Sequence, residues 1–287
     1  MPTGAGPWHG QPYCSVQSLA RRLRRCEKNV AMGGHLAVDE AVQGIASTNI
    51  HNKVFDLLQS RSLAGRILDA PCGQGVFARR LLQAGFEAVG IDVEAQKEKP
   101  EFEYHRADIG RVLPLAADSV DIVTSIEGIE HLEKPFEFVR ECHRVVAENG
   151  VLIMTTPNIS SIRSRWRWFW TGFHNKCKYA LDEYNPSPLH HINMFSFPKL
   201  RYLLHTNGFT IEEVTTNRIK PINWLYLPFV PLIYLISRAT VARARDSDLV
   251  PALGLEVMRQ MMSIPILFGE CTIVIARKTA GRKPLQK

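Results

Sequence analysis

Short apolar runs alternate with amphipathic stretches along most of the chain. An apolar run bounded by turn residues is typical of a buried strand, and apolar residues that recur every three or four positions are typical of a helix that packs on one face. The apolar runs predict strands at 66–70, 87–93, 104–109, 120–126, 151–155, 209–216 and 271–278. Strands that alternate with helices in this way predict an α/β fold.

Amphipathic helices are predicted on both sides of these strands. The spacing of Val54, Leu57 and Leu58 predicts a helix over 38–60 that packs on the rim of the fold. A further helix is expected to begin at Pro135 and to end near Asn149–Gly150, and another is expected over 199–208. The inward face of the helix that begins at Pro135 is expected to consist of Phe136, Val139, His143 and Val146.

A glycine-rich turn follows the first strand and opens a helix. The segment 66–81 reads RILDAPCGQGVFARRL, in which Gly73 and Gly75 let the backbone turn tightly and approach a ligand. Neither the GxGxxG pattern of dinucleotide-binding proteins nor the GxxxxGK[ST] pattern of P-loops is present. The acid before the glycines, Asp69, would repel a phosphate and would suit the ammonium group of an amino-acid moiety.

This turn resembles the first motif of the class I S-adenosylmethionine-dependent methyltransferases, an acid followed by x-Gly-x-Gly-x-Gly. Pro71 replaces the first glycine, and Cys72 is the intervening residue. The resemblance covers 66–158 and implies a Rossmann-like sheet of seven strands, parallel except for the last, with helices on both faces. It also implies that S-adenosylmethionine is the cofactor.

Two further acids follow the next two strands. Asp92 comes about 20 residues after the glycine turn, at the tip of a strand, where an acid can accept hydrogen bonds from both ribose hydroxyls. The resemblance implies this role for Asp92 and implies an adenine contact for Asp108. The predicted cofactor-binding residues are Asp69, Ala70, Cys72, Gly73, Gly75, Asp92, Val93, Asp108, Ile109 and Ile126.

The segment SIEGIEHLEKP after the fourth strand carries the candidate chemistry. Glu127, Glu130 and His131 are spaced i, i+3 and i+4, so a helical turn would bring them to one face above the cofactor. The pattern resembles the ubiquinone-biosynthesis O-methyltransferases, of methyltransferase type 11 or 23, and the enzymes that methylate the terminal 2'-hydroxyl of small RNAs. In those branches such a trio, with a later histidine, can hold a divalent cation.

His191, or its neighbour His190, is the candidate for that later histidine. The predicted catalytic residues, which are also the predicted ligands of Mg²⁺ or Mn²⁺, are Glu127, Glu130, His131 and His191. The alternative is a site without metal, in which Glu130 caps or orients and His131 acts as general base or lines the pocket.

The acceptor atom is predicted to be an oxygen. The Asn/Asp-Pro-Pro-aromatic motif of enzymes that methylate adenine or amide nitrogens is absent after the fourth strand. Transfer from a sulfonium is an in-line displacement, so the protein mainly aligns the acceptor and removes its proton. His131 is the predicted proton acceptor, directly or by way of a metal-bound alkoxide.

Two inserts are predicted, at about 159–198 as an acceptor lid and at about 217–270 as an apolar helical segment. Within 161–173, arginines alternate with tryptophans, a pattern that can stack on bases, grip phosphates, lie at a membrane interface or pack as a lid. The segment 221–237 has no charge over 17 residues and is interrupted by Pro228 and Pro231. We expect an interfacial helix pair on an anionic membrane, an apolar acceptor pocket, or a buried interface.

Charge and cysteine usage narrow the partners and the location. A formal charge of +7 favours an anionic surface or substrate, whether nucleic acid, acidic lipid or phosphate-bearing glycan. The six cysteines form no CxxC pair, which suits reduced thiols in the cytoplasm. Residues 1–45 are expected to form a flexible basic extension, in which LARRLRR at 19–25 is either a solvated basic helix or part of a transit peptide.

The predicted function is S-adenosylmethionine-dependent O-methylation of a small-molecule acceptor that is lipid-like, quinone-like or a lipid-linked glycan. The enzyme is expected in the cytoplasm, with an association with membranes as an option. One alternative is 2'-O-methylation of RNA, for which no recognisable RNA-binding module is present. Another is a scaffold at a membrane that binds the cofactor without catalysis, and a nucleotide-dependent dehydrogenase is a more distant one.

Overall fold

The computed structural model describes residues 46–243 and 249–279, without the side chains of 249–251. The flexible basic extension predicted at 1–45 lies outside the described residues, as does the first part of the helix expected over 38–60.

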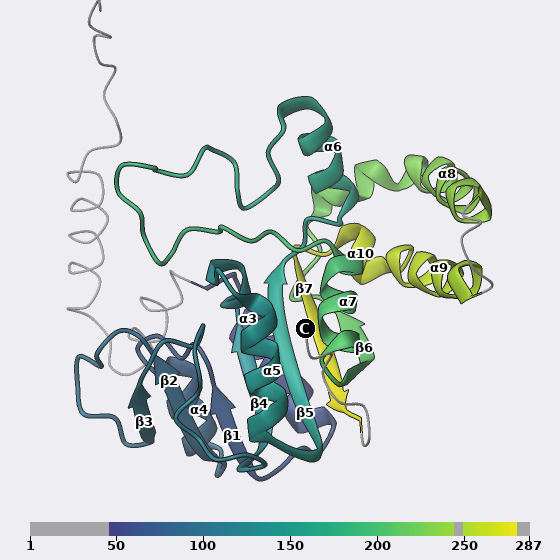
Figure 1. The fold of residues 1–287 in the computed structure, drawn as a ribbon. Coiled ribbons are helices and arrows are strands. Elements are labelled where there is room, and N and C mark those ends of the chain that lie inside the picture. Colours follow the sequence, from purple (N-terminus) through teal and green to yellow (C-terminus); the bar gives the residue numbers. More distant parts are fainter. Residues whose placement is uncertain (1–45, 244–248, 280–287) are drawn as a thin grey trace, which may run out of the picture. The chain divides into compact units, whose positions relative to one another are not determined.

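Seven strands form one mixed sheet in the order β3-β2-β1-β4-β5-β7-β6 (Figure 1). Strand β7 runs antiparallel to β5 and β6, and the other neighbouring pairs are parallel. The strands are β1 Arg66–Asp69, β2 Glu87–Asp92, β3 Glu103–Arg106, β4 Val120–Ile126, β5 Val146–Pro157, β6 Phe209–Thr215 and β7 Cys271–Lys278. The predicted α/β architecture and its seven-stranded sheet are therefore confirmed.

Helices cover both faces of this sheet. The helices on one face are α3 Ile50–Ser60 and α4 Val76–Gln83, and those on the other are α5 Pro135–Val145 and α7 Phe197–Thr206. Successive side chains of a strand point to opposite faces. Ile67 of β1 accordingly lies in the core under α3 and α4, and Leu68 lies in the core under α5 and α7.

The prediction was wrong about the helix α5 and the strand after it. We expected the helix to continue to Asn149–Gly150, but it ends at Val145, and β5 begins at Val146. The Asn-Gly pair marks an irregularity inside β5, where the pairing with β4 shifts register and Asn149 has a φ of 62°. A turn signal inside a strand is therefore easily mistaken for a helix end.

The residues predicted for the inward face of α5 were correct at Val139 and Val146, which are buried, and wrong at Phe136 and His143. The buried side chains are Pro135, Phe138, Val139, Cys142 and Val145, whereas Phe136 and His143 are only partly buried. These buried residues recur at spacings of three and four, as expected for one face of a helix. Val146 is buried as the first residue of β5 and does not belong to this face.

Two other predicted boundaries differ from the structure. Strand β3 ends at Arg106 and not at Ile109, because the Asp108 carboxylate accepts a hydrogen bond from the Gly110 amide and closes a turn. Helix α3 begins at Ile50, since Asn49 before it is in the left-handed region. The residues predicted for its apolar face, Val54, Leu57 and Leu58, are buried.

The helices of the two predicted inserts form a lobe beside the sheet, whereas the part of the first insert after α6 is a long loop (Figure 1). The elements of the lobe are α6 Ile162–Thr171, the 3₁₀ helix η2 Pro221–Phe229, α8 Val230–Arg243, α9 Leu249–Met261 and α10 Ile264–Phe268. A small core of Ile162, Leu267 and Phe268 joins α6 to α10. Helices α8 and α9 run side by side as a hairpin that projects from the sheet. No side chain of α8 is buried.

The apolar helical segment is longer than the charge-free run of 17 residues at 221–237. It extends from Pro221 to Arg243, which makes 23 residues of sufficient length and hydropathy to cross a membrane, and its apolar window is unburied. The chain nevertheless returns to the sheet where it left, because Ile219 forms a β-bridge with Gly269. If this segment inserts into a membrane, it therefore has to do so as a hairpin whose two ends remain on the same side of the membrane as the sheet.

The corrected face of α5 can be tested by two phenylalanine substitutions. Phe138→Ala should lower the free energy of unfolding by about 3–5 kcal/mol, because the side chain is fully buried. Phe136→Ala is the matched control and should cost clearly less, since Phe136 is partly exposed beside Tyr202. Urea denaturation measures the free energy of unfolding of both variants. Equal losses of stability would place Phe136 on the inward face of α5, as the sequence predicted.

Candidate active site

The carboxyl ends of β1, β2 and β4 meet at one edge of the sheet. The chain passes from β1 outward through β2 to β3 and then returns to place β4 on the other side of β1. In open α/β sheets, ligands bind outside the carboxyl ends of the strands at such a change of direction. The terminal residues of the three strands are Asp69, Asp92 and Ile126.

The glycine turn between β1 and α4 has the backbone that was predicted. Gly73 and Gly75 have φ values of 51° and 73°, a region that favours glycine. A Cβ atom on Gly75 would lie 2.4 Å from the Phe102 ring, so packing excludes a side chain there. A Cβ atom on Gly73 would meet nothing within 4 Å. The open side of Gly73 therefore leaves its backbone accessible to a ligand.

Asp92 joins the end of β2 to this turn. One carboxylate oxygen accepts a hydrogen bond from the Gly73 amide at 2.7 Å, and the other accepts from the Glu94 amide at 3.0 Å. Each carboxylate oxygen has a second lone pair, so both oxygens can still accept from the two hydroxyls of a ribose.

Asp69 lies at the end of β1. Its carboxyl group is buried, and the Thr124 hydroxyl lies 3.1 Å from Oδ1. Burial raises the pKa of Asp69 to about 8. Asp69 is thus an interior acid between β1 and β4, and its contact with the ammonium group of the cofactor stays a prediction.

The remaining predicted cofactor residues lie along the same edge. The Ala107 amide donates to the Asp92 carbonyl at 2.9 Å, which brings the turn after β3 against the end of β2. Asp108 in that turn is half exposed and pairs with Arg111 at 3.3 Å. Val93 is exposed, and the buried members of the set are Ala70, Cys72, Ile109 and Ile126.

A cluster of one carboxyl group and two imidazoles lies after β4. Donor atoms of Glu130, His131 and His191 lie within 4.8 Å of one another. The two imidazole rings meet edge to face, with their centroids 4.8 Å apart. Glu130 is fully buried, and neither of its carboxyl oxygens has a hydrogen-bond partner among the described residues. Buried polar atoms without a partner are rare in folded proteins and often mark a position for a ligand or water.

Backbone contacts hold this cluster together. Glu130 and His131 belong to the 3₁₀ helix η1 Ile129–His131. The Asn193 amide donates to the Glu130 carbonyl at 2.9 Å, and its side-chain amide donates to the Leu132 carbonyl at 2.6 Å. The His131 ring donates from Nδ1 to the His190 carbonyl at 3.0 Å. His131 Nε2 is consequently left as a proton acceptor.

This geometry also decides between the two neighbouring histidines. The ring of His191 joins the cluster, whereas His190 contributes its backbone carbonyl. Burial lowers the pKa of His131 and of His191, so both rings are neutral near pH 7. Burial raises the pKa of Glu130 to about 8.

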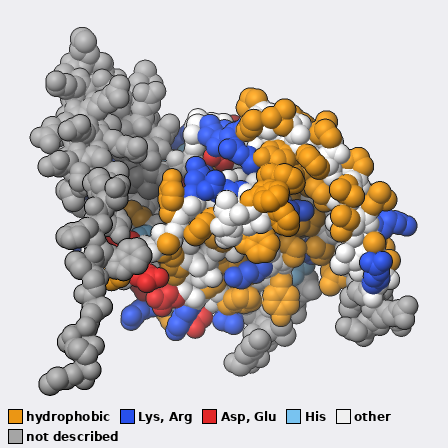
Figure 2. All heavy atoms as spheres, turned by 90° about the horizontal axis from the view of Figure 1, so that it is seen from above, with side chains coloured by type: hydrophobic (Ala, Val, Ile, Leu, Met, Phe, Trp, Pro, Cys, Tyr) orange, Lys and Arg blue, Asp and Glu red, His pale blue; other side chains and the backbone are white. Residues whose placement is uncertain are grey.

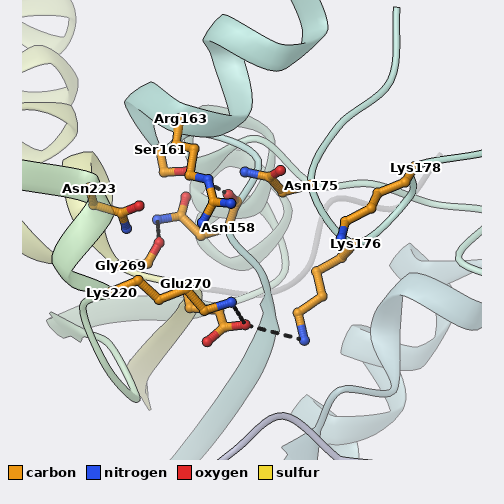
Figure 3. A pocket seen from close by; sticks show the side chains of 10 residues that line it. All are labelled: Asn158, Ser161, Arg163, Asn175, Lys176, Lys178, Lys220, Asn223, Gly269 and Glu270. Carbon is orange, nitrogen blue, oxygen red and sulfur yellow. Dashed lines mark hydrogen bonds and ion pairs between the residues drawn. The ribbon is translucent and has the colours of Figure 1, made fainter. Parts of the chain in front are cut away.

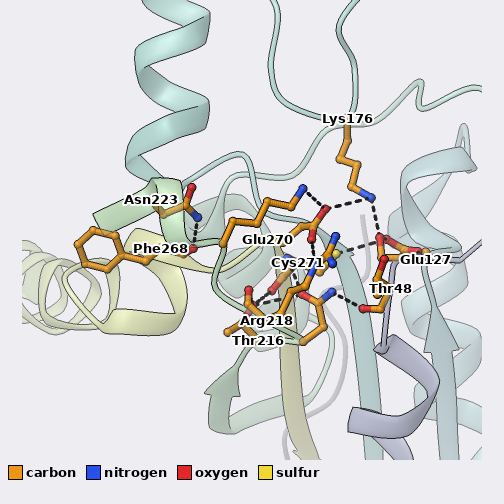
Figure 4. Close-up of polar contacts among 12 residues, drawn as sticks. Thr48, Glu127, Lys176, Thr216, Arg218, Asn223, Phe268, Glu270 and Cys271 are labelled. Carbon is orange, nitrogen blue, oxygen red and sulfur yellow. Dashed lines mark hydrogen bonds and ion pairs between the residues drawn. The ribbon is translucent and has the colours of Figure 1, made fainter. Parts of the chain in front are cut away.

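Glu127 does not join the other three residues in the structure. The expectation of a shared face required a helical backbone at Glu127, but its φ is 47° and η1 begins only at Ile129. Its carboxylate accepts from the Ser47 amide at 2.5 Å and from the Cys271 thiol at 3.4 Å (Figure 4). Lys176 donates to the Ser47 hydroxyl at 2.7 Å. Glu127 thus ties the chain before α3 to β7.

Comparisons with known proteins agree on one family. A family model described as a methyltransferase domain matches residues 38–214. The chain belongs to the class I S-adenosylmethionine-dependent methyltransferases.

Individual relatives match over part of their length. A protein of Mycolicibacterium smegmatis named as a probable S-adenosylmethionine-dependent methyltransferase is 29% identical over 187 residues, which cover 62% of this chain and 66% of the relative. A ubiquinone biosynthesis O-methyltransferase of Nitrosococcus oceani is 32% identical over 108 residues, which cover 34% of this chain and 46% of the relative. The chain therefore spans less than two thirds of these relatives.

The chain is similar to a solved structure from Haloferax volcanii, with a TM-score of 0.50 and 14% sequence identity. That structure is a complex between the Trm112 methyltransferase activator and a methyltransferase. The match covers 84% of this chain and 95% of that chain. At this identity the likeness concerns the fold alone.

The departure from the family motif at Pro71 has a structural counterpart that sequence reasoning missed. Gly128 lies so close to Pro71 that a Cβ atom on it would be 2.2 Å from the proline Cδ. This contact joins the glycine turn to the residue before η1, and therefore joins the cofactor loop to the imidazole cluster. The only local signal was the glycine between Glu127 and Ile129.

Gln96 is a second residue that the sequence did not reveal. Its side-chain amide donates to the Gly73 carbonyl at 2.6 Å, across 23 positions of sequence. No periodicity or motif marks such a contact in this methyltransferase, because the loop after β2 has no regular structure at this point.

The cofactor site can be tested with Asp92→Ala. Loss of the two acceptor oxygens should weaken S-adenosylmethionine binding by about 10- to 100-fold, measured by calorimetric titration. Asp56→Ala removes an exposed acid on α3 and should leave the affinity unchanged. Melting curves confirm that both variants are folded, and an unchanged affinity in the Asp92 variant would exclude this carboxylate from the site.

Proposed function

We propose that this methyltransferase transfers the methyl group of S-adenosylmethionine to a hydroxyl oxygen of a lipid-like acceptor, with quinone-like compounds and lipid-linked glycans included. The observation that carries the proposal is the cluster of the buried Glu130 with the partly buried His131 and His191 beside the cofactor edge, on a protein whose adjoining lobe exposes apolar and aromatic side chains. The ubiquinone biosynthesis O-methyltransferases among the relatives agree with an oxygen acceptor.

The bound cofactor supplies a methyl group that an oxygen nucleophile displaces from sulfur, with the electrons of the broken S–C bond going to sulfur. The protein has to align the acceptor hydroxyl and take its proton. His131 Nε2 suits this task, because the ring is neutral and its Nδ1–H is held by the His190 carbonyl. That carbonyl also favours the imidazolium that forms when the proton arrives.

Glu130 is suited to orient the acceptor. Its two buried carboxyl oxygens lack partners among the described residues. An acceptor hydroxyl beside them would supply the missing hydrogen bond. The ring of His191 lies edge to face with that of His131, at 4.8 Å between centroids, and restricts where that hydroxyl can sit.

The same three residues fit a divalent cation. One oxygen of Glu130 and one nitrogen each of His131 and His191 lie within 4.8 Å of one another. Two ligand atoms on opposite sides of Mg²⁺ are about 4.2 Å apart, so a small inward movement of the side chains would bring them to ligand distance. Glu130 would bind as the ionised carboxylate. A cation held there would lower the pKa of the acceptor hydroxyl. Glu127 is not included in this set, since its carboxylate is engaged by Ser47.

The exposed apolar surface supports a lipid acceptor and contact with a membrane. Figure 2 shows hydrophobic side chains gathered over one part of the surface, with Lys and Arg side chains beside them. The exposed aromatic and apolar residues of the lobe include Trp168, Phe169 and Trp170 on α6, Trp224 and Leu225 on η2, and Leu235 and Ile236 on α8. Such a surface next to basic residues favours peripheral binding to an anionic membrane.

The proposal predicts the effect of His131→Ala on methyl transfer. With S-adenosylmethionine labelled in its methyl group and an extract of the source organism, label should enter the solvent-extractable lipid fraction. His131→Ala should lower that rate by about 10²- to 10⁴-fold without changing cofactor affinity. His190→Ala is the matched control and should keep the rate, because its backbone carbonyl remains.

Two further arms separate the alternatives. Assays with EDTA and with added Mg²⁺ show whether the cation is needed. Label that enters RNA in place of lipid would contradict the proposed acceptor and support 2'-O-methylation.

A further inference from the structure

A second pocket lies between the lobe and the sheet, apart from the residues proposed for catalysis. Its volume is about 240 Å³, and α6, η2, the segment after α6 and the turn before β7 enclose it (Figure 3). None of the residues assigned above to cofactor binding or to the imidazole cluster lines it.

The pocket is electropositive. Its basic residues are Arg163, Lys176, Lys178 and Lys220, and Glu270 is its only acidic lining residue. Glu270 is held by Lys220 at 2.8 Å and by Lys176 at 3.6 Å, and it also pairs with Arg218. These cations hold the pKa of Glu270 at about 2 although its partial burial opposes this, so the carboxylate is charged and already over-compensated.

Two of the basic residues have no acid to neutralise them. Arg163 and Lys178 form no ion pair with any residue in the described part of the chain. The pocket therefore has spare positive charge, which an anion would neutralise.

The pocket also contains buried hydrogen-bond acceptors without donors. The Asn158 side-chain nitrogen lies 2.9–3.2 Å from the carbonyl oxygens of Pro265, Ile266 and Gly269, and this arrangement fixes the orientation of the amide. Its Oδ1 atom is buried and has no partner among the described residues.

Asn223 repeats this arrangement on η2. Its side-chain nitrogen donates to the Phe268 carbonyl, and its Oδ1 is likewise without a described partner. Asn158 and Asn223 are only 3% and 4% exposed. Two amide oxygens in one pocket call for a ligand with hydroxyl or amine donors.

We infer that this pocket binds the phosphate-bearing polyol headgroup of an anionic membrane lipid, with the phosphate at Arg163, Lys178 and Lys220 and the hydroxyls at the amide oxygens of Asn158 and Asn223. The neighbouring elements suit the rest of such a lipid. Arg163 is on α6 beside exposed tryptophans, and Asn223 precedes the exposed Trp224 and Leu225 of η2. Acyl chains would follow this apolar surface out of the pocket.

The pocket adjoins the catalytic edge through Lys176. This lysine lines the pocket and also donates to Ser47, whose side chain bonds Glu127 after β4 (Figure 4). The step from a bound lipid to the methyl acceptor rests on the proposed function, whereas headgroup binding does not.

Vesicle cosedimentation tests headgroup binding without any requirement for turnover. Vesicles of phosphatidylcholine with one fifth phosphatidylinositol should bind the protein more tightly than vesicles with one fifth phosphatidylmethanol, which has the same net charge but neither hydroxyl nor amine donors. Vesicles of phosphatidylcholine alone should bind least.

Two double variants separate the pocket from diffuse surface charge. Arg163→Gln with Lys178→Gln removes the two charges of the pocket that have no ion-pair partner among the described residues, and should weaken binding to phosphatidylinositol vesicles about tenfold more than Arg238→Gln with Arg243→Gln, which removes two exposed charges from α8. Melting temperature and S-adenosylmethionine affinity should be unchanged in both. His131→Ala should bind vesicles like the unmodified protein, so a failed reaction and a failed lipid site are told apart.

Three results would overturn the inference. Equal losses in the two double variants would mean that charge acts without a site. Equal affinity for phosphatidylinositol and phosphatidylmethanol vesicles would remove the role of the amide oxygens. Binding of inorganic phosphate or glycerol 3-phosphate in calorimetry, with no affinity for any vesicle, would make the ligand a soluble phosphate compound.

Discussion

The position of β4 beside β1 is the constraint on which the site depends. Because β2 and β3 lie on one side of β1 and β4 lies on the other, the loops after β1, β2 and β4 open at one edge. Two contacts then lock these loops together. The Gly73 amide bonds Asp92, and Gly128 packs against Pro71. The glycine turn, Asp92 and the imidazole cluster are therefore positioned by the sheet and not by flexible segments.

The buried polar groups near this edge are costly to the free protein. An unsatisfied buried donor or acceptor costs about 1–3 kcal/mol, and Glu130 carries two oxygens in that state. Asn193 holds the Glu130 backbone, and the His190 carbonyl holds the His131 ring. A site that keeps its groups in place before the acceptor arrives loses less entropy when it binds. The amide oxygens of Asn158 and Asn223 present the same situation in the second pocket.

Much of the fold could be predicted because its signals are local. Strands β4 and β7 have the bounds expected from their apolar runs, and the glycine turn has the backbone that its glycines imply. Expectations failed where a local pattern had two structural meanings. The Asn149–Gly150 pair marks a bulge and not a helix end, and the spacing from Glu127 to His131 has no helical backbone at its first residue.

The contacts of Glu127 lie beyond local inference, since they join residues 80 and 144 positions apart. The second pocket is similar, because it collects side chains from both inserts and from the turn before β7. Sequence patterns indicated the basic and aromatic character of these inserts, and only the fold shows that they enclose one pocket.

A crystal structure with S-adenosylhomocysteine tests the central claim most directly. The account predicts the ribose hydroxyls at Asp92 and the sulfur facing the cluster of Glu130, His131 and His191, with open space between them for an acceptor hydroxyl. A sulfur that faces another surface, or that protein atoms separate from His131, would contradict it.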